Sequence, residues 1–217
     1  MKGKEFNNLI KTISILKVDE VPVSKVVNVI DDPHVMLMIV KTLDGSPVFG
    51  VEGPGILLYD LIVKLQNNIE YVTSLSENSL DLVSENGEYR FGYDPKTQPY
   101  KVKVPKLELP YYVNVPAKTV QEAVKAVNGV HDYVTMEGDG ESLKMVAMKA
   151  GTVVKITLGK TSDRFNVKLP FDYVKKLAKV TTGIVRMEFE TDYPTRWTWN
   201  DGYYEYTALL APRVERE

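Results

Sequence analysis

The feature that most constrains the fold is an internal repeat, because a chain that repeats itself is expected to build two copies of one structural unit. The segment KEFNNLIK at 4–11 resembles KTVQEAVK at 118–125, at an offset of 114 residues. A second pair, YDLIVKL at 59–65 and FDYVKKL at 171–177, matches at an offset of 112 residues. Two separate matches at nearly one offset indicate a duplication of about half the chain. The alternative is a coincidence between two pairs of amphipathic helices.

The four repeated segments have the spacing of amphipathic helices. Apolar residues recur every three or four positions from Phe6 to Leu16 and again from Val120 to Val127, which places them on one face of a helix. Thr119 and Glu122 match the capping box S/T-x-x-E and are expected to begin the third helix. The predicted helices are 4–17, 57–67, 118–128 and 171–180.

Between the helices the apolar period changes to two, which indicates β-strands. The segments 153–158 and 185–190 alternate apolar and polar residues. Residues 136–148 predict a hairpin that turns at 138–140. Residues 196–210 predict a second hairpin, which turns at Asn200-Asp201-Gly202.

Three prolines interrupt the segment 102–118, so we expect it to be neither a helix nor a central strand. We interpret it as an extended connector between the two halves. The predicted fold class is α+β, with two similar domains that each contain two helices and an antiparallel sheet. The predicted domains are residues 1–100 and 117–217, and the predicted connector is 101–116.

Composition narrows the class of protein. With 44% hydrophobic and 26% charged residues the chain suits a soluble globular protein. The absence of Cys excludes disulfides, Cys-ligated zinc and a thiol nucleophile, and two histidines leave little for a His-rich metal site. No apolar stretch approaches the roughly 18 residues of a membrane span, and MKGKEFNNLI lacks the core of a signal peptide. We therefore expect a cytoplasmic protein without a membrane partner.

Charge is distributed unevenly along the chain. The net charge is −2, yet the four predicted helices hold nine lysines and four acidic residues, so they carry +5 and the remainder carries −7. Lysines gathered on one surface can bind a phosphate backbone without reading its sequence. For any single lysine the alternative is ordinary solvation of a polar helix face. The pattern across four helices favours a polyanionic partner.

Four segments resemble those of proliferating cell nuclear antigen (PCNA), the sliding clamp of archaeal and eukaryotic replication. The two most specific are IDDPHV, which has the family's Asp31, His34 and Val35, and the ending LAPRVE. The match runs in register over nearly the whole second half, whereas the first half fits more loosely and is short for the family. The resembling segments are 4–17, 30–40, 106–127 and 191–215.

The resemblance implies a DNA-clamp fold and a trimeric ring whose subunits join head to tail, with the helices facing duplex DNA. It implies a polymerase processivity factor for replication and repair, without catalytic activity, metal or cofactor. The expected partners are duplex DNA, other copies or paralogous subunits, a DNA polymerase, a clamp loader, and a ligase or nuclease that carries a clamp-binding motif.

The resemblance also implies two sets of functional residues. The lysines expected to face DNA are Lys11, Lys17, Lys64, Lys118, Lys125, Lys175, Lys176 and Lys179. The hydrophobic groove expected to receive partner motifs consists of Ile30, His34, Val35, Leu37, Leu107, Leu109, Pro110, Pro194, Leu209, Ala211 and Pro212. At Ile62 and Val63 the sequence departs from the family, which usually has basic residues there.

No enzyme motif accompanies these features: the sequence lacks a P-loop, G-x-G-x-x-G, G-x-S-x-G and H-E-x-x-H. The carboxylates of Asp139, Glu141, Asp192 and Asp201 fall in predicted turns, where Asp has a local structural role. They could form a nuclease metal site, but no spacing supports it. Two function classes remain: a clamp that encircles DNA, and a clamp-like regulator or adaptor, of viral or mobile-element origin among others, that binds replication proteins or other clamp subunits without encircling DNA alone.

Overall fold

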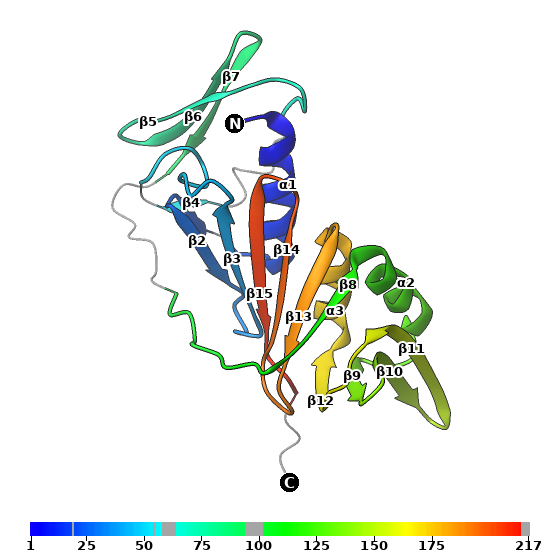
Figure 1. The fold of residues 1–217 in the computed structure, drawn as a ribbon. Helices are drawn as coiled ribbons and strands as arrows, with labels where there is room; N and C mark the ends of the chain where they lie inside the picture. The colour runs from blue at the N-terminus through cyan, green and yellow to red at the C-terminus, as the bar shows by residue number, and fades with distance from the viewer. Residues whose placement is uncertain (19, 54, 58–63, 94–101, 214–217) are drawn as a thin grey trace. The chain divides into compact units, whose positions relative to one another are not determined.

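The computed structural model describes residues 1–18, 20–53, 55–57, 64–93 and 102–213 (Figure 1). Contacts divide the chain into two compact units. The first unit is Met1–Val104 together with Asp201–Tyr206, and the second is Pro105–Asn200 together with Thr207–Glu217.

The first unit is built on helix α1 (Gly3–Ile13), which continues into a single 3₁₀ turn, η1 (Ser14–Leu16). The predicted apolar face is confirmed, because the side chains from Phe6 to Ile13 that follow the helical spacing are buried. At the start of the helix the Lys2 N–H donates to the Glu5 carboxylate at 2.7 Å. Gly3 permits a close approach here, since a Cβ at this position would lie 2.1 Å from the Gln66 carbonyl oxygen.

The strands of the first unit form small antiparallel groups. β1 pairs with β4, β2 with β3, and β6 lies between β5 and β7. In the order of the largest sheet β3 is followed by β15 (Tyr204–Leu210), whose first residues belong to this unit. The other strands are β1 (Glu20–Pro22), β2 (Val26–Ile30), β3 (Met36–Thr42), β4 (Gly55–Leu57), β5 (Val72–Leu75), β6 (Ser79–Ser84) and β7 (Gly87–Gly92).

The helix predicted at 57–67 is wrong wherever its residues are described. Leu57 ends β4, where its backbone pairs with Glu20, and the chain from Lys64 to Gln66 is irregular. The side chain of Asn7 explains this conformation, because it donates to the Leu65 carbonyl at 2.8 Å and accepts from the Leu65 N–H at 2.9 Å. Residues 58–63, which include Ile62 and Val63, lie outside the described residues.

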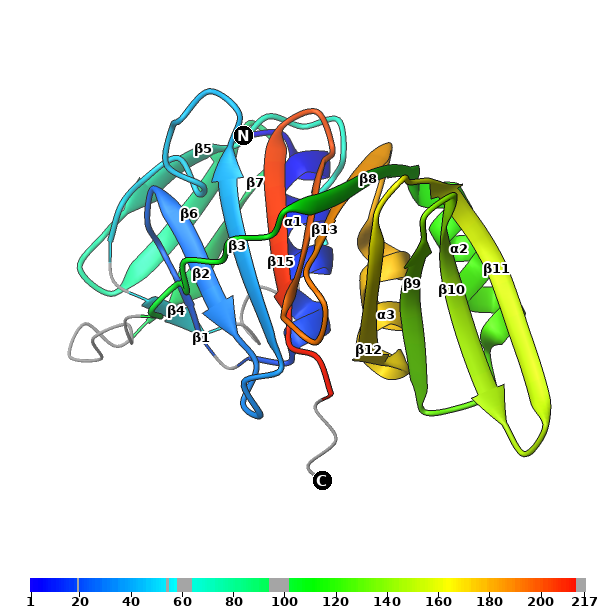
Figure 2. The same ribbon diagram turned by 60° about the horizontal axis from the view of Figure 1, so that its bottom comes forward.

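The second unit contains two helices and two antiparallel sheets (Figure 2). The strand order is β11-β10-β9-β12 in one sheet and β15-β14-β13-β8 in the other. Both predicted hairpins are present, as β9–β10 and β14–β15. The elements are β8 (Tyr111–Pro116), α2 (Ala117–Val127), β9 (Tyr133–Asp139), β10 (Ser142–Lys149), β11 (Thr152–Lys160), β12 (Arg164–Pro170), α3 (Phe171–Val180), β13 (Ile184–Phe189) and β14 (Thr195–Asn200).

Two expectations for this unit are corrected. The capping box at Thr119 is not used, because α2 already begins at Ala117 after Pro116, and the Ala117 N–H donates instead to the Gly183 carbonyl at 2.9 Å. The segment expected to be a connector up to residue 116 forms strand β8 from Tyr111 onward, hydrogen-bonded to β13. Alternate burial along β8 gives it one core-facing side, and Pro116 is tolerated at its last position.

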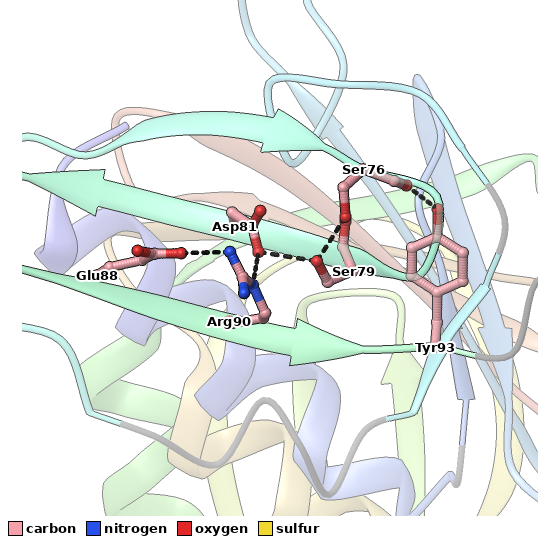
Figure 3. A network of polar contacts seen from close by, with 6 residues as sticks. All are labelled: Ser76, Ser79, Asp81, Glu88, Arg90 and Tyr93. Atoms are coloured by element: carbon pink, nitrogen blue, oxygen red, sulfur yellow. Dashed lines mark hydrogen bonds and ion pairs between the residues drawn. The ribbon is translucent and has the colours of Figure 1, made fainter.

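A polar network lies on the sheet β5-β6-β7 (Figure 3). The Asp81 carboxylate is only 8% exposed and accepts hydrogen bonds from Arg90 and from the Ser79 hydroxyl, both at 2.9 Å. Arg90 also forms an ion pair with Glu88 at 2.7 Å. The hydrogen bond from Arg90 lowers the pKa of Asp81 below its usual value. The network consists of Ser76, Ser79, Asp81, Glu88, Arg90 and Tyr93.

Replacing Asp81 with Asn is expected to lower the free energy of unfolding by about 1 kcal/mol at neutral pH, because the charge-assisted bond to Arg90 is lost but is partly screened by solvent. A depressed folded-state pKa stabilises the protein above the unfolded pKa of about 3.9, and this contribution disappears as the pH falls through the folded value. The loss in Asp81→Asn should therefore vanish in strong acid. Urea unfolding at pH 7 and in acid measures both effects.

The matched control is Glu88→Gln, which removes a more exposed partner of the same arginine and should leave stability nearly unchanged at both pH values. Equal losses for the two variants would contradict the role assigned to Asp81.

Candidate functional site

Helices α2 and α3 lie side by side in the second unit (Figures 1 and 2). A groove of about 430 Å³ runs between them. The buried side chains of Val124 and Ala178 give the groove an apolar base. Three of the predicted lysines also line it. The groove is lined by Gln121, Val124, Lys125, Asn128, Lys175, Ala178 and Lys179.

The lysines at this groove differ in how they are held. The Lys175 ammonium donates to the Asn128 side-chain oxygen at 3.0 Å, which fixes its direction across the two helices. Lys125 and Lys179 are exposed. Asn128 was not predicted from the sequence, because it stands at the C-cap of α2 and carries no local signal of a contact with the next helix.

Two other predicted lysines of this unit have partners on their own helix. Lys118 forms an ion pair with Glu122 at 3.9 Å, one turn further along α2. The Lys176 ammonium lies 4.4 Å from the centre of the Tyr173 ring, a cation–π distance. Neither residue lines the groove between α2 and α3.

The remaining predicted lysines belong to the first unit. Lys11 lies in the last turn of α1, and Lys17 follows η1 with a left-handed φ of 55°. Lys64 is exposed but lies on an irregular segment rather than a helix. A single DNA-facing surface that combines the lysines of both units stays a prediction.

In the first unit, the loop between β2 and β3 carries the predicted partner-binding residues His34 and Val35. Asp31 organises this loop: its carboxylate is 2% exposed and accepts the N–H groups of Val35 and Met36, each at 2.8 Å. The Asp31 carbonyl also accepts the His34 N–H at 2.9 Å. His34 has a left-handed φ of 55° and is exposed. The loop therefore presents the imidazole outward from a tightly bonded turn.

The strands beside this loop hold the other two predicted groove residues of the first unit. Ile30 ends β2 and is half-buried, whereas Leu37 lies in β3 and is 5% exposed.

In the second unit, the predicted groove residues fall on two segments. The connector contributes Leu107 and Leu109, both half-buried, and the exposed Pro110. The C-terminal hairpin contributes Pro194, Leu209, Ala211 and Pro212; all are half-buried except Leu209, which is 6% exposed.

The chain beyond β15 is held by a backbone hydrogen bond. The Arg213 N–H donates to the Lys168 carbonyl on β12 at 2.8 Å, so the Ala-Pro-Arg segment is tied to the second unit. Because the predicted groove residues belong to different units, the groove that would combine them stays a prediction.

Of the four turn carboxylates, those of Asp139 and Asp201 have the local structural role that their positions predicted. The Asp139 carboxylate accepts the N–H groups of Glu141 and Ser142 at 3.0 and 2.8 Å and forms an ion pair with Lys144. The Lys144 hydrogen bond lowers the pKa of Asp139 far below its usual value. At the next hairpin the Asp201 carboxylate accepts the N–H groups that follow it, at 3.1 and 2.9 Å.

The described part of the chain contains no group of three His, Cys, Asp or Glu side chains that could hold a metal ion. No helix within the same residues is both long and apolar enough to cross a membrane.

The α+β arrangement of helices and antiparallel sheets is that of the DNA-clamp class of fold, because solved clamp structures match it over nearly the whole chain. A. fulgidus PCNA bound to the C-terminal region of FEN-1 matches with a TM-score of 0.83 and 21% identity, over 100% of this chain and 98% of that chain. The PCNA2–PCNA3 complex from Sulfolobus tokodaii matches with a TM-score of 0.77 and 18% identity, over 99% and 98%.

Curated proteins with similar sequences belong to the same class. The DNA polymerase sliding clamp of Methanothrix thermoacetophila is 26% identical over 210 residues, which cover 86% of this chain and 84% of the relative. That of Archaeoglobus fulgidus is 23% identical over 193 residues, or 82% and 77%. No protein-family model matches the chain. The resemblance to PCNA is confirmed, because the chain is similar over most of its length to archaeal DNA polymerase sliding clamps and to solved PCNA structures.

Replacing Asp31 with Ala is expected to lower the free energy of unfolding by about 2 kcal/mol, because two backbone N–H groups lose a buried acceptor. Asp32→Ala is the matched control. The Asp32 carboxylate is exposed, so its loss should change the free energy of unfolding by no more than about 0.5 kcal/mol. Urea unfolding measures both. Hydrogen exchange at the Val35 and Met36 amides should accelerate only in Asp31→Ala, and unchanged exchange there would contradict this role.

Proposed function

We propose that the chain is a DNA sliding clamp: a polymerase processivity factor that encircles duplex DNA and recruits replication and repair proteins. The observation that carries this proposal is the lysine-rimmed groove between α2 and α3. Lysines on exposed helices neutralise phosphates without contacting base edges, which suits a protein that must move along any sequence. In this role the protein is a cytoplasmic scaffold without catalytic activity or cofactor.

The proposed DNA-facing residues are the eight lysines predicted from the sequence, with Lys125, Lys175 and Lys179 as the central group of the second unit. Helices α1, α2 and α3 together hold seven lysines and three acidic residues, a charge of +4, so the rest of the chain carries −6. An acidic body repels DNA from every other surface and so favours the basic helices as the contact.

The proposed assembly is a head-to-tail ring of three subunits. Strand β11 is suited to such a contact. It is the outermost strand in the described order β11-β10-β9-β12 and spans nine residues, and a long unpaired edge is a liability unless another chain covers it. Val153 near its start is 53% exposed. The neighbouring subunit is another copy or a paralogue, as in the PCNA2–PCNA3 complex from Sulfolobus tokodaii.

The proposed recruitment site is the hydrophobic groove built from the loop at His34, the connector at Leu107 and Leu109, and the segment from Leu209 to Pro212. Its ligands are short clamp-binding motifs of a DNA polymerase, a clamp loader, a ligase or a nuclease. The PCNA of A. fulgidus bound to the C-terminal region of FEN-1 supports this proposal.

Native mass spectrometry at micromolar concentration is expected to show a trimer. Val153→Asp should weaken it, because the charge would have to be buried against the next subunit. Leu43→Asp is the matched control, since Leu43 is also 53% exposed but lies in a turn of the first unit. A chain that stays monomeric up to crystal-growth concentrations would refute the homotrimer and favour a regulator or a heteromeric subunit.

Replacing Lys125 and Lys179 together with Gln is expected to flatten the salt dependence of DNA retention. Each lost phosphate contact changes the slope of log K against log salt by about 0.9, so the double variant should lose about 1.8. The control is Lys25→Gln with Lys103→Gln, two exposed lysines that lie outside the helices and outside β11. Equal slopes for the two double variants at unchanged melting temperature would count against DNA contact through α2 and α3.

A further inference from the structure

A row of charged side chains crosses one face of the sheet β15-β14-β13-β8. Glu188 on β13 lies directly opposite Arg196 on β14 and opposite Tyr112 on β8. The Glu188 carboxylate contacts Arg196 at 3.3 Å and Arg186 at 3.4 Å. The Arg186 guanidinium in turn lies 4.0 Å from the centre of the Tyr112 ring. Three strands are thereby linked through their side chains.

This row also reaches the connector. The Nη2 atom of Arg196 donates a hydrogen bond to the Leu107 carbonyl at 3.1 Å, while its Nη1 atom faces Glu188. The two side chains are largely shielded, at 28% exposed for Arg196 and 12% for Glu188. Charge-assisted hydrogen bonds gain strength in such partly desolvated places. Arg196 therefore bridges the sheet and the connector.

The face that holds Arg196 also holds Leu209. The hydroxyls of Thr198 and Thr207 meet across β14 and β15 at 3.4 Å, so these two side chains are on the same face. Side chains two residues apart along a strand share a face, which places Arg196 and Leu209 on that face as well. Arg196 is thus linked to two residues of the proposed groove. It donates a hydrogen bond to the Leu107 carbonyl, and its side chain lies on the same face of the sheet as that of Leu209.

The connector depends on such contacts for its position. From Val102 to Pro110 it has no helical or strand conformation. Pro105 and Pro110 lack N–H groups and so cannot donate backbone hydrogen bonds. A segment of this kind is held by the side chains that reach its carbonyls. Because restraint before binding reduces the entropy lost on binding, such a bond affects the affinity for a ligand that contacts the connector.

We infer that Arg196, oriented by Glu188, is a positioning residue of the partner-motif groove: it fixes the connector at Leu107 and thereby sets the affinity for clamp-binding peptides. This inference rests on the proposed function of the groove. The planar guanidinium fork can serve a carbonyl and a carboxylate at once, which makes Arg196 the bridging residue of the row. Arg186 contacts the same carboxylate from the other side and supports only the sheet.

The test compares Arg196→Gln with Arg186→Gln in the full chain. The probe is a synthetic peptide of the C-terminal region of FEN-1, titrated by calorimetry, and NMR order parameters are measured for the backbone of residues 106–109. Arg196→Gln is expected to weaken the binding of the peptide roughly tenfold and to lower the order parameters of the connector. Arg186→Gln should stay within about twofold of the unchanged chain, because a more exposed ion pair contributes little.

A lowered melting temperature of Arg196→Gln with unchanged peptide affinity and unchanged connector order parameters would overturn the inference, since Arg196 would then stabilise only the sheet. Equal effects of the two variants on peptide affinity and on the order parameters would overturn it as well. If the unchanged chain does not bind the peptide, the proposed groove is wrong. The order parameters of residues 106–109 then test the tether alone: lower values in Arg196→Gln support it, and unchanged values overturn it.

Discussion

Burial of one apolar face on each amphipathic helix is the interaction on which the rest of the structure depends. In α2 and α3 the 3.6-residue period that buries Val124 and Ala178 also places Lys125 and Lys179 at the rim of the groove between the helices. The hydrophobic effect, at roughly 25 cal/mol per Å² of buried apolar area, therefore both holds the helices in place and determines where their charge is presented. The basic surface is a consequence of core packing.

The second half of the chain could be predicted closely from its sequence, because its signals are local. Helix α3 has the predicted bounds 171–180. The hairpin β14–β15 turns at the predicted Asp201-Gly202, whereas β9–β10 turns at residues 140 and 141, slightly beyond the predicted 138–140. The errors have tertiary causes. Apolar spacing predicted a helix at 57–67, but Asn7 holds the Leu65 backbone in another conformation. Thr119 suggested a cap, but the Gly183 carbonyl takes the first N–H of α2.

The residues of the candidate site also divide into those with a local sequence signal and those that depend on tertiary contacts. Residue types and a repeated pattern were enough to nominate the lysines of α2 and α3, and the resemblance at a short motif was enough to nominate His34 and Val35. Asn128 and Arg196 could not be found in this way. Asn128 meets a lysine 47 positions away, and Arg196 meets a carbonyl 89 positions away. No local pattern encodes contacts of such separation, which arise only once the sheets and helices have formed.

The two proposed surfaces place opposite demands on their side chains. A clamp that slides needs DNA contacts that exchange easily, and exposed lysines on long flexible stems provide them without sequence preference. A groove that selects protein motifs needs walls that are fixed before the ligand arrives, since affinity is lost to every segment that must first be ordered. The structure has both kinds of element: Lys125 and Lys179 are exposed on their helices, whereas Asp31 and Arg196 hold the backbone of a loop and of the connector through side-chain hydrogen bonds. Under the proposed function, the difference between weak, uniform contact with DNA and selective contact with proteins follows from how firmly each side chain is held.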